Sequence, residues 1–569
     1  MNSQAVSIFV IADFTIGSFS ALLERDTDAP RLKVTEAPYD QVEPSLLALA
    51  DGNSPAREVV FVWTQPDAVI ASFAALLRGE IVDIARVLEE VNAFCEVVAR
   101  AAARCQSLFI PLWILPAHQR GLGLLDLKLQ DQGVWAALLQ MNGRLLERLS
   151  RTRNVYPLNA PRWAQKVGER SFNSKQWYLG KVPLSNEVYK EAVLDLKAGL
   201  SALAGQTRKL LVVDLDNTLW GGIVGDTGWE GITLGGHHAA GEAFVDFQRA
   251  LKGFKRRGIL LGIVSKNDES VAMEALTRHP EMVLRPADFV AWRINWGDKA
   301  QNLAELVKEL NLGLQSTVFI DDSAFERGRI RESLPEVLVP EWPTNPMLYV
   351  KTLEGLRCFD VAALTDEDRK RHAMYSTERQ RDVSMGQATS PEAWLKTLEM
   401  KIKIEPLQPN NISRVIQLLN KTNQMNLKTR RMTADAFQAW CNRQDRFFWA
   451  FRVSDRFGDS GLTALLSLER SGARVEIIDF VVSCRVFKRG VEEALVSKAV
   501  EQCRRMGVER LVCTYDPTEK NAPCLAFWQN SGFERQGDGH TFVFDAARSY
   551  DPPAHIEISE ITSDHSRGL

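Results

Sequence analysis

The stretch KLLVVDLDNTLWGG, from Lys209 to Gly222, decides the fold of the central part of this chain. Its apolar run, Leu210 to Val213, has the composition of a buried parallel strand. Asp214 and Asp216 follow at the C-terminal end of that strand, where open α/β sheets bind their ligands. Because side chains alternate along an extended backbone, we expect both carboxylates on one side of the chain, converging on one small volume.

Two carboxylates held this close repel each other, so they need a cation or a shared proton between them. Oxygen ligands favour Mg²⁺ as that cation. The alternative interpretation is an Asp-rich turn after a strand, with no ligand. Three later segments favour the metal site.

The first of these segments, ILLGIVSKND, is a second buried run that ends in Ser265, beside Lys266 and Asn267. A serine at a strand end can donate a hydrogen bond to a phosphate oxygen, although it can equally be a turn residue. The second segment, NWGDKAQNLAELVKEL, places Lys299 near the start of an amphipathic helix. Lys299 is either a solvated surface charge or the cation that a phosphoryl group needs beside its aspartates.

The third segment, STVFIDDSAFER, is another apolar strand that ends in two acids, Asp321 and Asp322. Two strand ends that each carry two carboxylates are costly without a metal ion. The four segments together therefore predict a metal and phosphate site.

In this order, the segments resemble the motifs of the haloacid dehalogenase (HAD) superfamily of phosphotransferases, over roughly residues 208–343. The resemblance implies Asp214 as the nucleophile and Asp216 as general acid and base. It implies Mg²⁺ bound by Asp214, the backbone carbonyl of Asp216, and Asp321 or Asp322. The residues placed on the substrate or its phosphoryl group are Thr218, Ser265, Lys266, Asn267 and Lys299.

Longer stretches resemble the FkbH-like family, a HAD subgroup (subfamily IIIC) of polyketide pathways. They include DLDNTLWGGIVGD, WGDKAQN, FIDDSAFER, LPEVLVPEWP and LTDEDRKR. Members take the glyceryl group of 1,3-bisphosphoglycerate, remove phosphate, and leave the glyceryl group as a thioester on the phosphopantetheine arm of an acyl carrier protein. One departure is Ser-Ala-Phe at 323–325, where the family pattern has Asn-Pro-Phe; this concerns loop geometry only.

The gaps between the motifs hold about one helix and its loops each, less than a separate domain requires. We therefore expect a HAD-like Rossmannoid domain at 205–362 without a large cap. Such an open site suits a group carried on a protein.

The first 180 residues alternate short apolar runs with helical patterns, which predicts a parallel-sheet α/β domain. A hydrolase of the SGNH type carries its serine just after the first strand, where this chain has Asp13, and no D-x-x-H follows near the domain end. We therefore predict a degenerate SGNH-like domain, non-catalytic, used for docking or scaffolding. Pro157, Pro161 and the segment Ser171 to Pro183 are interpreted as its exit.

After a helical connector at 363–395, strand patterns and two helices at 396–548 resemble the α+β fold of GNAT acetyltransferases. Arg485 and Gly490 lie in a basic loop before a helix, which either binds a pyrophosphate or the carrier arm, or only caps the helix. Cys484 is either a thiol that carries the acyl group, favoured by neighbouring cations, or a buried structural cysteine. The tail at 549–569 is predicted to be disordered.

Composition limits the partners and the compartment. A net charge of -3 gives no reason to expect nucleic acid or membrane as a partner. No apolar segment is long enough to span a bilayer, and the N-terminus lacks a signal-peptide pattern, so we expect a cytoplasmic protein. The eight cysteines lack C-x-x-C spacing, which argues against disulfides and structural zinc.

The resemblance to the FkbH-like family thus implies an enzyme that loads glyceryl on a holo acyl carrier protein. One rival is a plain Mg²⁺-dependent phosphatase or phosphotransferase for small molecules. A second is a carrier-binding scaffold without turnover. A third is a true acetyltransferase in the last domain.

Overall fold

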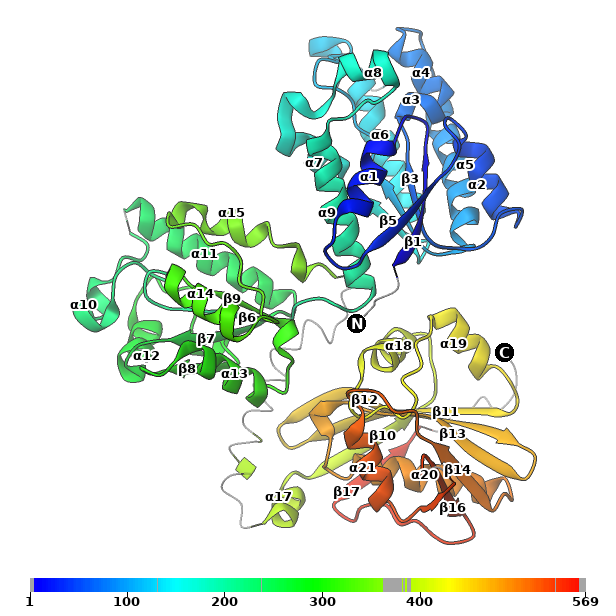
Figure 1. Ribbon diagram of the computed structural model, residues 1–569, viewed down its shortest axis with the longest axis vertical. Coiled ribbons are helices and arrows are strands. Elements are labelled where there is room, and N and C mark those ends of the chain that lie inside the picture. Colours follow the sequence, from blue (N-terminus) through cyan, green and yellow to red (C-terminus); the bar gives the residue numbers. More distant parts are fainter. Residues whose placement is uncertain are drawn as a thin grey trace. The chain divides into compact units, whose positions relative to one another are not determined.

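The computed structural model describes residues 5–129, 131–236, 238–361, 381, 384–385, 390–537 and 539–561. Within these ranges the chain forms three sheets, shown in Figure 1, and the α/β fold class expected from the sequence is confirmed. The chain divides into two compact units: one ends at Thr207 and holds the first sheet, and the other begins at Arg208 and holds the other two.

The first sheet consists of parallel strands in the order β2, β1, β3, β4, β5. Its strands are β1 (Val6–Ala12), β2 (Leu32–Glu36), β3 (Arg57–Trp63), β4 (Cys105–Pro111) and β5 (Val155–Leu158). One face packs on α2 (Val42–Ala50), α4 (Ala71–Leu77), α5 (Ile84–Ala102) and α6 (Val134–Leu149). The other face packs on α1 (Gly17–Arg25), α7 (Ala160–Val167) and α9 (Asn186–Leu203). The short α3 (Pro66–Val69) and α8 (Ser174–Gly180) complete the unit.

The predicted exit from this domain is wrong. Pro157 lies in β5, which pairs in parallel with β4, and Pro161 lies in α7. The segment at 171–183 includes α8, and α9 follows it to bury Val188 and Leu196 against the sheet. Proline is tolerated in β5 because this strand forms the sheet edge. The first unit therefore continues to Thr207, beyond the boundary placed at residue 180.

A buried carboxylate organises the loop before α6. Asp126 accepts hydrogen bonds at Oδ1 from the backbone N–H of Leu122 (2.8 Å) and Val134 (2.9 Å). Its Oδ2 accepts the backbone N–H of Trp135 (2.7 Å). A Cβ at Gly133 would meet the backbone oxygen of Asp126 at 1.6 Å, so only glycine fits there. The carboxylate thus satisfies N–H groups at the start of α6 that a helix leaves unpaired.

Replacing Asp126 by alanine is expected to lower the free energy of unfolding of the first unit by about 2 to 4 kcal/mol, because three backbone N–H groups lose their acceptor. Thermal unfolding of the full chain, followed by calorimetry, measures the change. The exposed Asp131 on the same loop gives the control Asp131→Ala, expected to change stability by less than about 0.5 kcal/mol. Equal unfolding of the two variants would contradict the role of Asp126.

At the end of β1, Asp13 stands where an SGNH hydrolase has its serine. It is buried, and Oδ1 and Oδ2 lie 3.0 Å and 3.2 Å from the backbone nitrogen of Gln65, which donates to them. Burial raises the pKa of Asp13 from 3.8 to about 7, and the Gln65 hydrogen bond only partly opposes it. The folded chain therefore favours the protonated carboxyl.

This raised pKa predicts a pH dependence of stability. Between pH 3.8 and about 7 the folded chain holds a proton that the unfolded chain has lost, so the stabilisation is present at low pH and disappears as the pH rises through 7. Asp13→Asn should therefore have a free energy of unfolding about 2 to 4 kcal/mol higher than that of the wild type at pH 8, and show little difference at pH 4. Equal effects at both pH values would contradict this.

The second sheet is parallel, in the order β8, β7, β6, β9. Its strands are β6 (Leu210–Val213), β7 (Leu260–Ser265), β8 (Ala291–Ile294) and β9 (Thr317–Ile320). Alternate residues of β6 enter two cores. Leu211 and Val213 pack with α10 (Val224–Gly231), α11 (Ala239–Arg256), α12 (Glu269–Arg278) and α15 (Tyr349–Glu354). Leu210 and Val212 pack with α13 (Lys299–Glu309) and α14 (Ala324–Ser333).

The third sheet is mixed, in the order β15, β16, β14, β13, β12, β11, β10, β17. Its strands are β10 (Met400–Glu405), β11 (Arg446–Asp455), β12 (Gly458–Ser471), β13 (Arg474–Val482), β14 (Arg510–Thr514), β15 (Glu534–Gln536), β16 (Thr541–Asp545) and β17 (Ile556–Glu560). Its helices are α17 (Pro391–Thr397), α18 (Ile412–Lys421), α19 (Ala434–Cys441), α20 (Val491–Arg505) and α21 (Ala522–Asn530). The strand patterns KIKIEPL, RFFWAFRV, LTALLSLER and RVEIIDFVVS and the two helical patterns at 412–422 and 491–506, on which the prediction for 396–548 depends, are confirmed as β10 to β13, α18 and α20.

The prediction of a disordered tail at 549–569 is wrong for β17, which pairs in parallel with β10. Its residues alternate, with Ile556 buried and Glu557 exposed, and this short pattern was outweighed by Pro552 and Pro553 before it. Most of the predicted connector at 363–395 lies outside the described residues. In the part of the chain that the structure describes, no helix combines the length and apolar character needed to cross a membrane.

Candidate active site

Strand pairing in the second sheet brings two of the predicted carboxylates together. In β6 and β9, Val213 pairs with Ile320, and the backbone N–H of Asp214 donates to the oxygen of Ile320 (3.0 Å). Asp214 and Asp321 therefore leave the sheet side by side. By alternation both continue the faces of Val212 and Phe319, which pack on α13 and α14.

Helix α13 begins at this position and supplies the cation. Asp298 caps it by accepting the N–H of Gln301 (3.0 Å), which fixes Lys299 as its first residue. The Lys299 Nζ lies 2.6 Å from Asp321 Oδ2 and 3.0 Å from Asp214 Oδ1. Its side chain is only 5% exposed. Of the two interpretations of Lys299, the solvated surface charge is wrong.

Asp322 completes a group of three carboxylates with Asp214 and Asp321, whose ligand oxygens all lie within 4.8 Å of one another. Thr218 holds Asp322 in place: its hydroxyl donates to Asp322 Oδ1 (3.3 Å) and accepts the Asp322 backbone N–H (3.2 Å). Three hard oxygen donors within this distance fit a small divalent cation such as Mg²⁺. Asp214, Asp321 and Asp322 are the residues that would hold the ion, and Thr218 positions Asp322 beside it.

The charges of the group are not balanced by Lys299 alone. Burial, with a further contribution from the Asp214 carboxylate, raises the pKa of Asp321 to about 6. The same two causes raise the pKa of Asp322. Burial opposes the Lys299 ammonium, but Asp214 and Asp321 outweigh it and raise the pKa of Lys299. One ammonium thus faces three carboxylates, and a further positive charge would relieve their repulsion.

The side chain of Asp216 does not join this group, contrary to the expected convergence with Asp214. Strand β6 ends at Val213 and the chain bends at Leu215, so the alternation of an extended strand no longer applies at residue 216. Asp216 Oδ1 instead accepts from Trp220 Nε1 (2.8 Å) and from the Val224 N–H (3.1 Å). Burial raises the pKa of Asp216, against these hydrogen bonds. The ligand role of its backbone carbonyl stays a prediction.

The predicted phosphate-binding residues at the end of β7 and just after it lie in different environments. Ser265 is the last residue of β7 and is buried. Asn267 donates from Nδ2 to Asp216 Oδ2 (2.8 Å), so it orients the predicted general acid. Lys266 instead forms an ion pair with Glu326 (2.8 Å), on the first turn of α14. The roles of Ser265 and Lys266 at a phosphate stay predictions.

Three supporting residues were not predicted from the sequence. Arg327 Nη1 donates to the backbone oxygens of Asp321 (2.8 Å) and Asp322 (2.7 Å), which fixes the chain after β9. Tyr349, from α15, donates its hydroxyl to the oxygen of Asn217 (3.0 Å). Trp220 holds Asp216. Trp220 lies within KLLVVDLDNTLWGG and Arg327 within STVFIDDSAFER, so their positions in the sequence could have indicated a role at the site. Nothing in the sequence marks Tyr349.

The predicted carrier-arm loop lies at the start of α20. Gly490 caps this helix with φ of 91°, and the Lys488 N–H donates to Glu492 Oε1 (2.8 Å), in the first turn of the helix. These contacts are those of a helix cap, the second interpretation of the loop, and pyrophosphate binding stays a prediction. Cys484 is exposed, so its interpretation as a buried structural cysteine is wrong.

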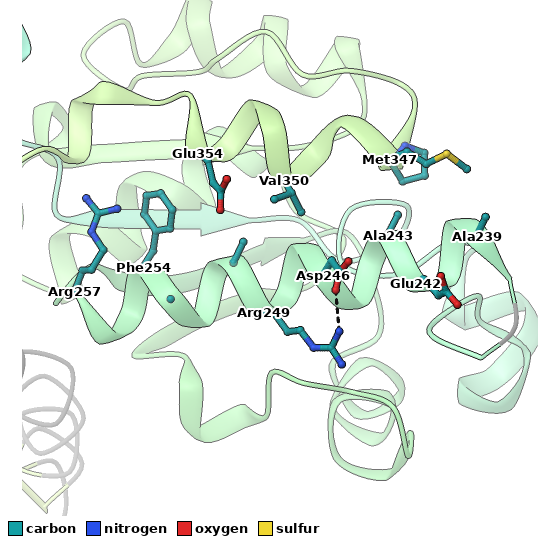
Figure 2. A pocket seen from close by; sticks show the side chains of 13 residues that line it. Ala239, Glu242, Ala243, Asp246, Arg249, Phe254, Arg257, Met347, Val350 and Glu354 are labelled. Carbon is teal, nitrogen blue, oxygen red and sulfur yellow. Dashed lines mark hydrogen bonds and ion pairs between the residues drawn. The ribbon is translucent and has the colours of Figure 1, made fainter. Parts of the chain in front are cut away.

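A separate groove of about 860 Å³ lies between α11 and α15 (Figure 2). It is lined by small residues of α11, including Ala243, with Met347 and Glu354 opposite. Asp246 and Arg249 form an ion pair along its side (2.8 Å). The predicted catalytic, metal-binding and phosphate-binding residues do not line this groove, so it is distinct from the carboxylate site.

No protein-family model matches this chain, and no curated protein matches it. Among solved structures, it is similar to the N-terminal part of protein BF1531 from Bacteroides fragilis, described as containing a phosphatase domain complexed with Mg. The two are 26% identical, with a TM-score of 0.58, over 63% of this chain and 95% of that chain.

The chain also aligns with the ribosomal-protein-S18-alanine N-acetyltransferase of Escherichia coli, at 13% identity and a TM-score of 0.19, over 25% of this chain and 90% of that chain. This level of similarity supports no inference about activity. The stronger match and the carboxylate group agree with each other. The chain contains a phosphatase-like region in which Asp214, Asp321 and Asp322 form a group suited to Mg²⁺.

Proposed function

We propose that this chain is a HAD-type enzyme that takes D-1,3-bisphosphoglycerate, dephosphorylates it, and loads the glyceryl group as a thioester on the phosphopantetheine thiol of an acyl carrier protein in polyketide biosynthesis. The observation that carries the proposal is the buried group of Asp214, Asp321 and Asp322 around Lys299 at the C-terminal edge of a parallel sheet. The FkbH-like sequence motifs narrow the reaction from phosphoryl transfer to glyceryl transfer.

Asp214 is the nucleophile in the hydrolysis of the phosphate ester. Its carboxylate attacks phosphorus, the bond to the ester oxygen breaks, and water then hydrolyses the aspartyl phosphate to release inorganic phosphate. Asp216 gives a proton to the departing oxygen and later takes one from water, held for both by Trp220 and Asn267. Lys299 neutralises charge on the phosphoryl oxygens.

Mg²⁺ bound by the three carboxylates would neutralise charge on the phosphoryl group and keep it close to Asp214. The chain's own part is to hold the ligands in place. Thr218 and Arg327 do this for Asp321 and Asp322 through four hydrogen bonds.

The acyl step needs less from the protein, because an acyl phosphate is already activated. The carrier thiolate attacks the carbonyl carbon, the carbon–sulfur bond forms, and the carbon–oxygen bond to phosphate breaks. The departing phosphate dianion is the group that Lys299 and the site must neutralise. An open site is needed, because the thiol arrives on a protein-borne arm.

A plain Mg²⁺-dependent phosphatase is the second candidate, because the similar Bacteroides chain is described by its phosphatase domain alone. The full chain is mixed with bisphosphoglycerate, Mg²⁺ and holo acyl carrier protein, and the intact carrier is weighed. A mass gain of one glyceryl group, removable by hydroxylamine and absent with apo carrier, supports the proposal. Phosphate release without that gain favours the phosphatase.

A further inference from the structure

An ion pair joins the loop after β7 to the first turn of α14. Lys266 Nζ lies 2.8 Å from Glu326 Oε1. Lys266 directly follows Ser265, the last residue of β7, and α14 is the helix that follows β9. The Lys266 side chain is 38% exposed and that of Glu326 is 11% exposed. The lysine end of the pair is therefore accessible from solvent.

The strand order places this ion pair across the end of β6. Strand β6 lies between β7 and β9 and pairs in parallel with both, so the three strands end at one edge. Val264 of β7, Val212 of β6 and Ile330 of α14 share one core, on the face of the sheet that Asp214 continues. A link from the end of β7 to α14 on that face crosses the end of β6, where Asp214 stands.

Hydrogen bonds of neighbouring residues connect both ends of the ion pair to the catalytic carboxylates. Ser323, which caps α14, donates its backbone N–H to Asp321 Oδ1 (2.8 Å). Asn267, the residue after Lys266, donates from Nδ2 to Asp216 Oδ2 (2.8 Å). The start of α14 and the loop after β7 therefore both border the carboxylate site.

The carboxylate site itself is almost closed to solvent. The side chains of Asp214, Lys299 and Asp321 are 8%, 5% and 0% exposed. Because exposure rises from these groups to the ion pair, the ion pair lies at the mouth of the site. An anionic substrate that reaches Asp214 passes Glu326, whose carboxylate repels it, and Lys266, whose ammonium attracts it.

A phosphate is a stronger partner for Lys266 than Glu326 is. A partly exposed ion pair contributes little to stability, whereas a lysine forms strong charge-assisted hydrogen bonds with phosphate oxygens. Glu326 loses little when Lys266 leaves, because the helix dipole stabilises a carboxylate in the first turn of α14. The four-carbon stem of a lysine is flexible, so its ammonium can move to a new acceptor.

We propose that Lys266 binds the second anionic group of a doubly charged substrate, in exchange for Glu326, while the first phosphoryl group occupies the carboxylate site; this rests on the function proposed above. A compound with one phosphate gains nothing from this exchange, whereas a compound with two replaces Glu326 by its second phosphate. Lys266 is thereby a specificity-determining residue, and Glu326 holds it at the mouth until the substrate arrives.

Two phosphate esters of one carbon chain test this: propane-1,3-diol bisphosphate and propyl phosphate, which differ by one phosphate. Release of inorganic phosphate by the full chain with Mg²⁺ gives kcat/KM for each. The wild type should prefer the bisphosphate, and Lys266→Met should lower that preference by about 10-fold or more, because it removes a charge-assisted contact. The control Lys308→Met removes an exposed lysine of α13 and should leave the preference unchanged.

Glu326→Gln separates this exchange from an ion pair that only holds the two segments together. Glutamine keeps the shape of the side chain, but it binds Lys266 less strongly and no longer repels an anion. The KM for the bisphosphate should therefore fall by about 3-fold or more, while it rises in Lys266→Met. A purely structural ion pair predicts losses in both variants. Lys266→Arg retains the charge and should retain most of the preference.

Three results would each overturn the inference: a wild type without preference for the bisphosphate, equal losses for both esters in Lys266→Met, or a higher KM in Glu326→Gln. The proposed function is tested separately, because these assays contain no carrier protein. If the preference depends on Lys266 but the carrier gains no glyceryl mass, the proposed function is wrong and the second anion site stands. If the carrier is loaded without such a preference, the reverse holds.

Discussion

Phosphate release is expected to fall by at least about 10³-fold when Asp214 is replaced by asparagine, because the amide cannot act as the nucleophile. The substitution keeps the shape of the side chain, and Lys299 keeps its contact of 2.6 Å with Asp321, so the fold should survive. Release of inorganic phosphate from bisphosphoglycerate and from p-nitrophenyl phosphate measures the effect. Carrier loading should be lost in the same variant.

The control for this result is Asp246→Asn, which makes the same chemical change in the same domain. Asp246 lines the groove of Figure 2 and pairs with Arg249, away from the carboxylate group. Its substitution should leave phosphate release within about 2-fold. Retention of full phosphate release by Asp214→Asn would contradict the role of Asp214 as the nucleophile, whereas full pathway output from a variant that has lost phosphate release would favour a carrier-binding scaffold.

Replacing Lys299 by methionine is expected to remove both activity and stability. Methionine fills a similar volume but leaves the buried carboxylates of Asp214 and Asp321 without their ammonium, which costs about 3 to 5 kcal/mol in a buried ion pair. The second unit should therefore unfold at a clearly lower temperature in EDTA. Added Mg²⁺ should raise the unfolding temperature more in this variant than in the wild type, because the ion replaces the missing charge.

The exposed Lys308 on the same helix provides the control, Lys308→Met, for which no such shift is expected. An Mg²⁺ effect of equal size in Lys299→Met, Lys308→Met and wild type would show that the three carboxylates do not hold the ion. A folded and active Lys299→Met variant would contradict the proposed role of Lys299 in the site.

Much of the site was predictable because it depends on strand ends. The apolar runs before Asp214, Ser265 and Asp321 are β6, β7 and β9, and parallel pairing places their C-terminal ends at one edge. Lys299 was predictable as a residue near the start of an amphipathic helix. Its pairing with two buried carboxylates was not predictable, because Asp214 and Asp321 are far from Lys299 in sequence and nothing in the sequence marks them as its partners.

The failures have local physical causes. The alternation of side chains along a strand predicted Asp216 beside Asp214. The chain bends at Leu215, and the alternation of an extended strand does not predict such a bend. β5 was missed because proline within a run argues against a strand, and only the position at a sheet edge makes it acceptable. The burial of Lys299 and the exposure of Cys484 depend on packing between distant segments, which periodicity does not report.

Strand β17 covers the outer edge of β10, so a C-terminal truncation of the chain would expose that edge. On the way to β17, His555 contacts the backbone oxygen of Arg489 (2.9 Å), next to the glycine that starts α20. A stop codon after residue 548 would leave the outer edge of β10 open, and neighbouring molecules could extend it into intermolecular sheets. We therefore expect residues that composition marks as dispensable to protect the last third of the protein from aggregation.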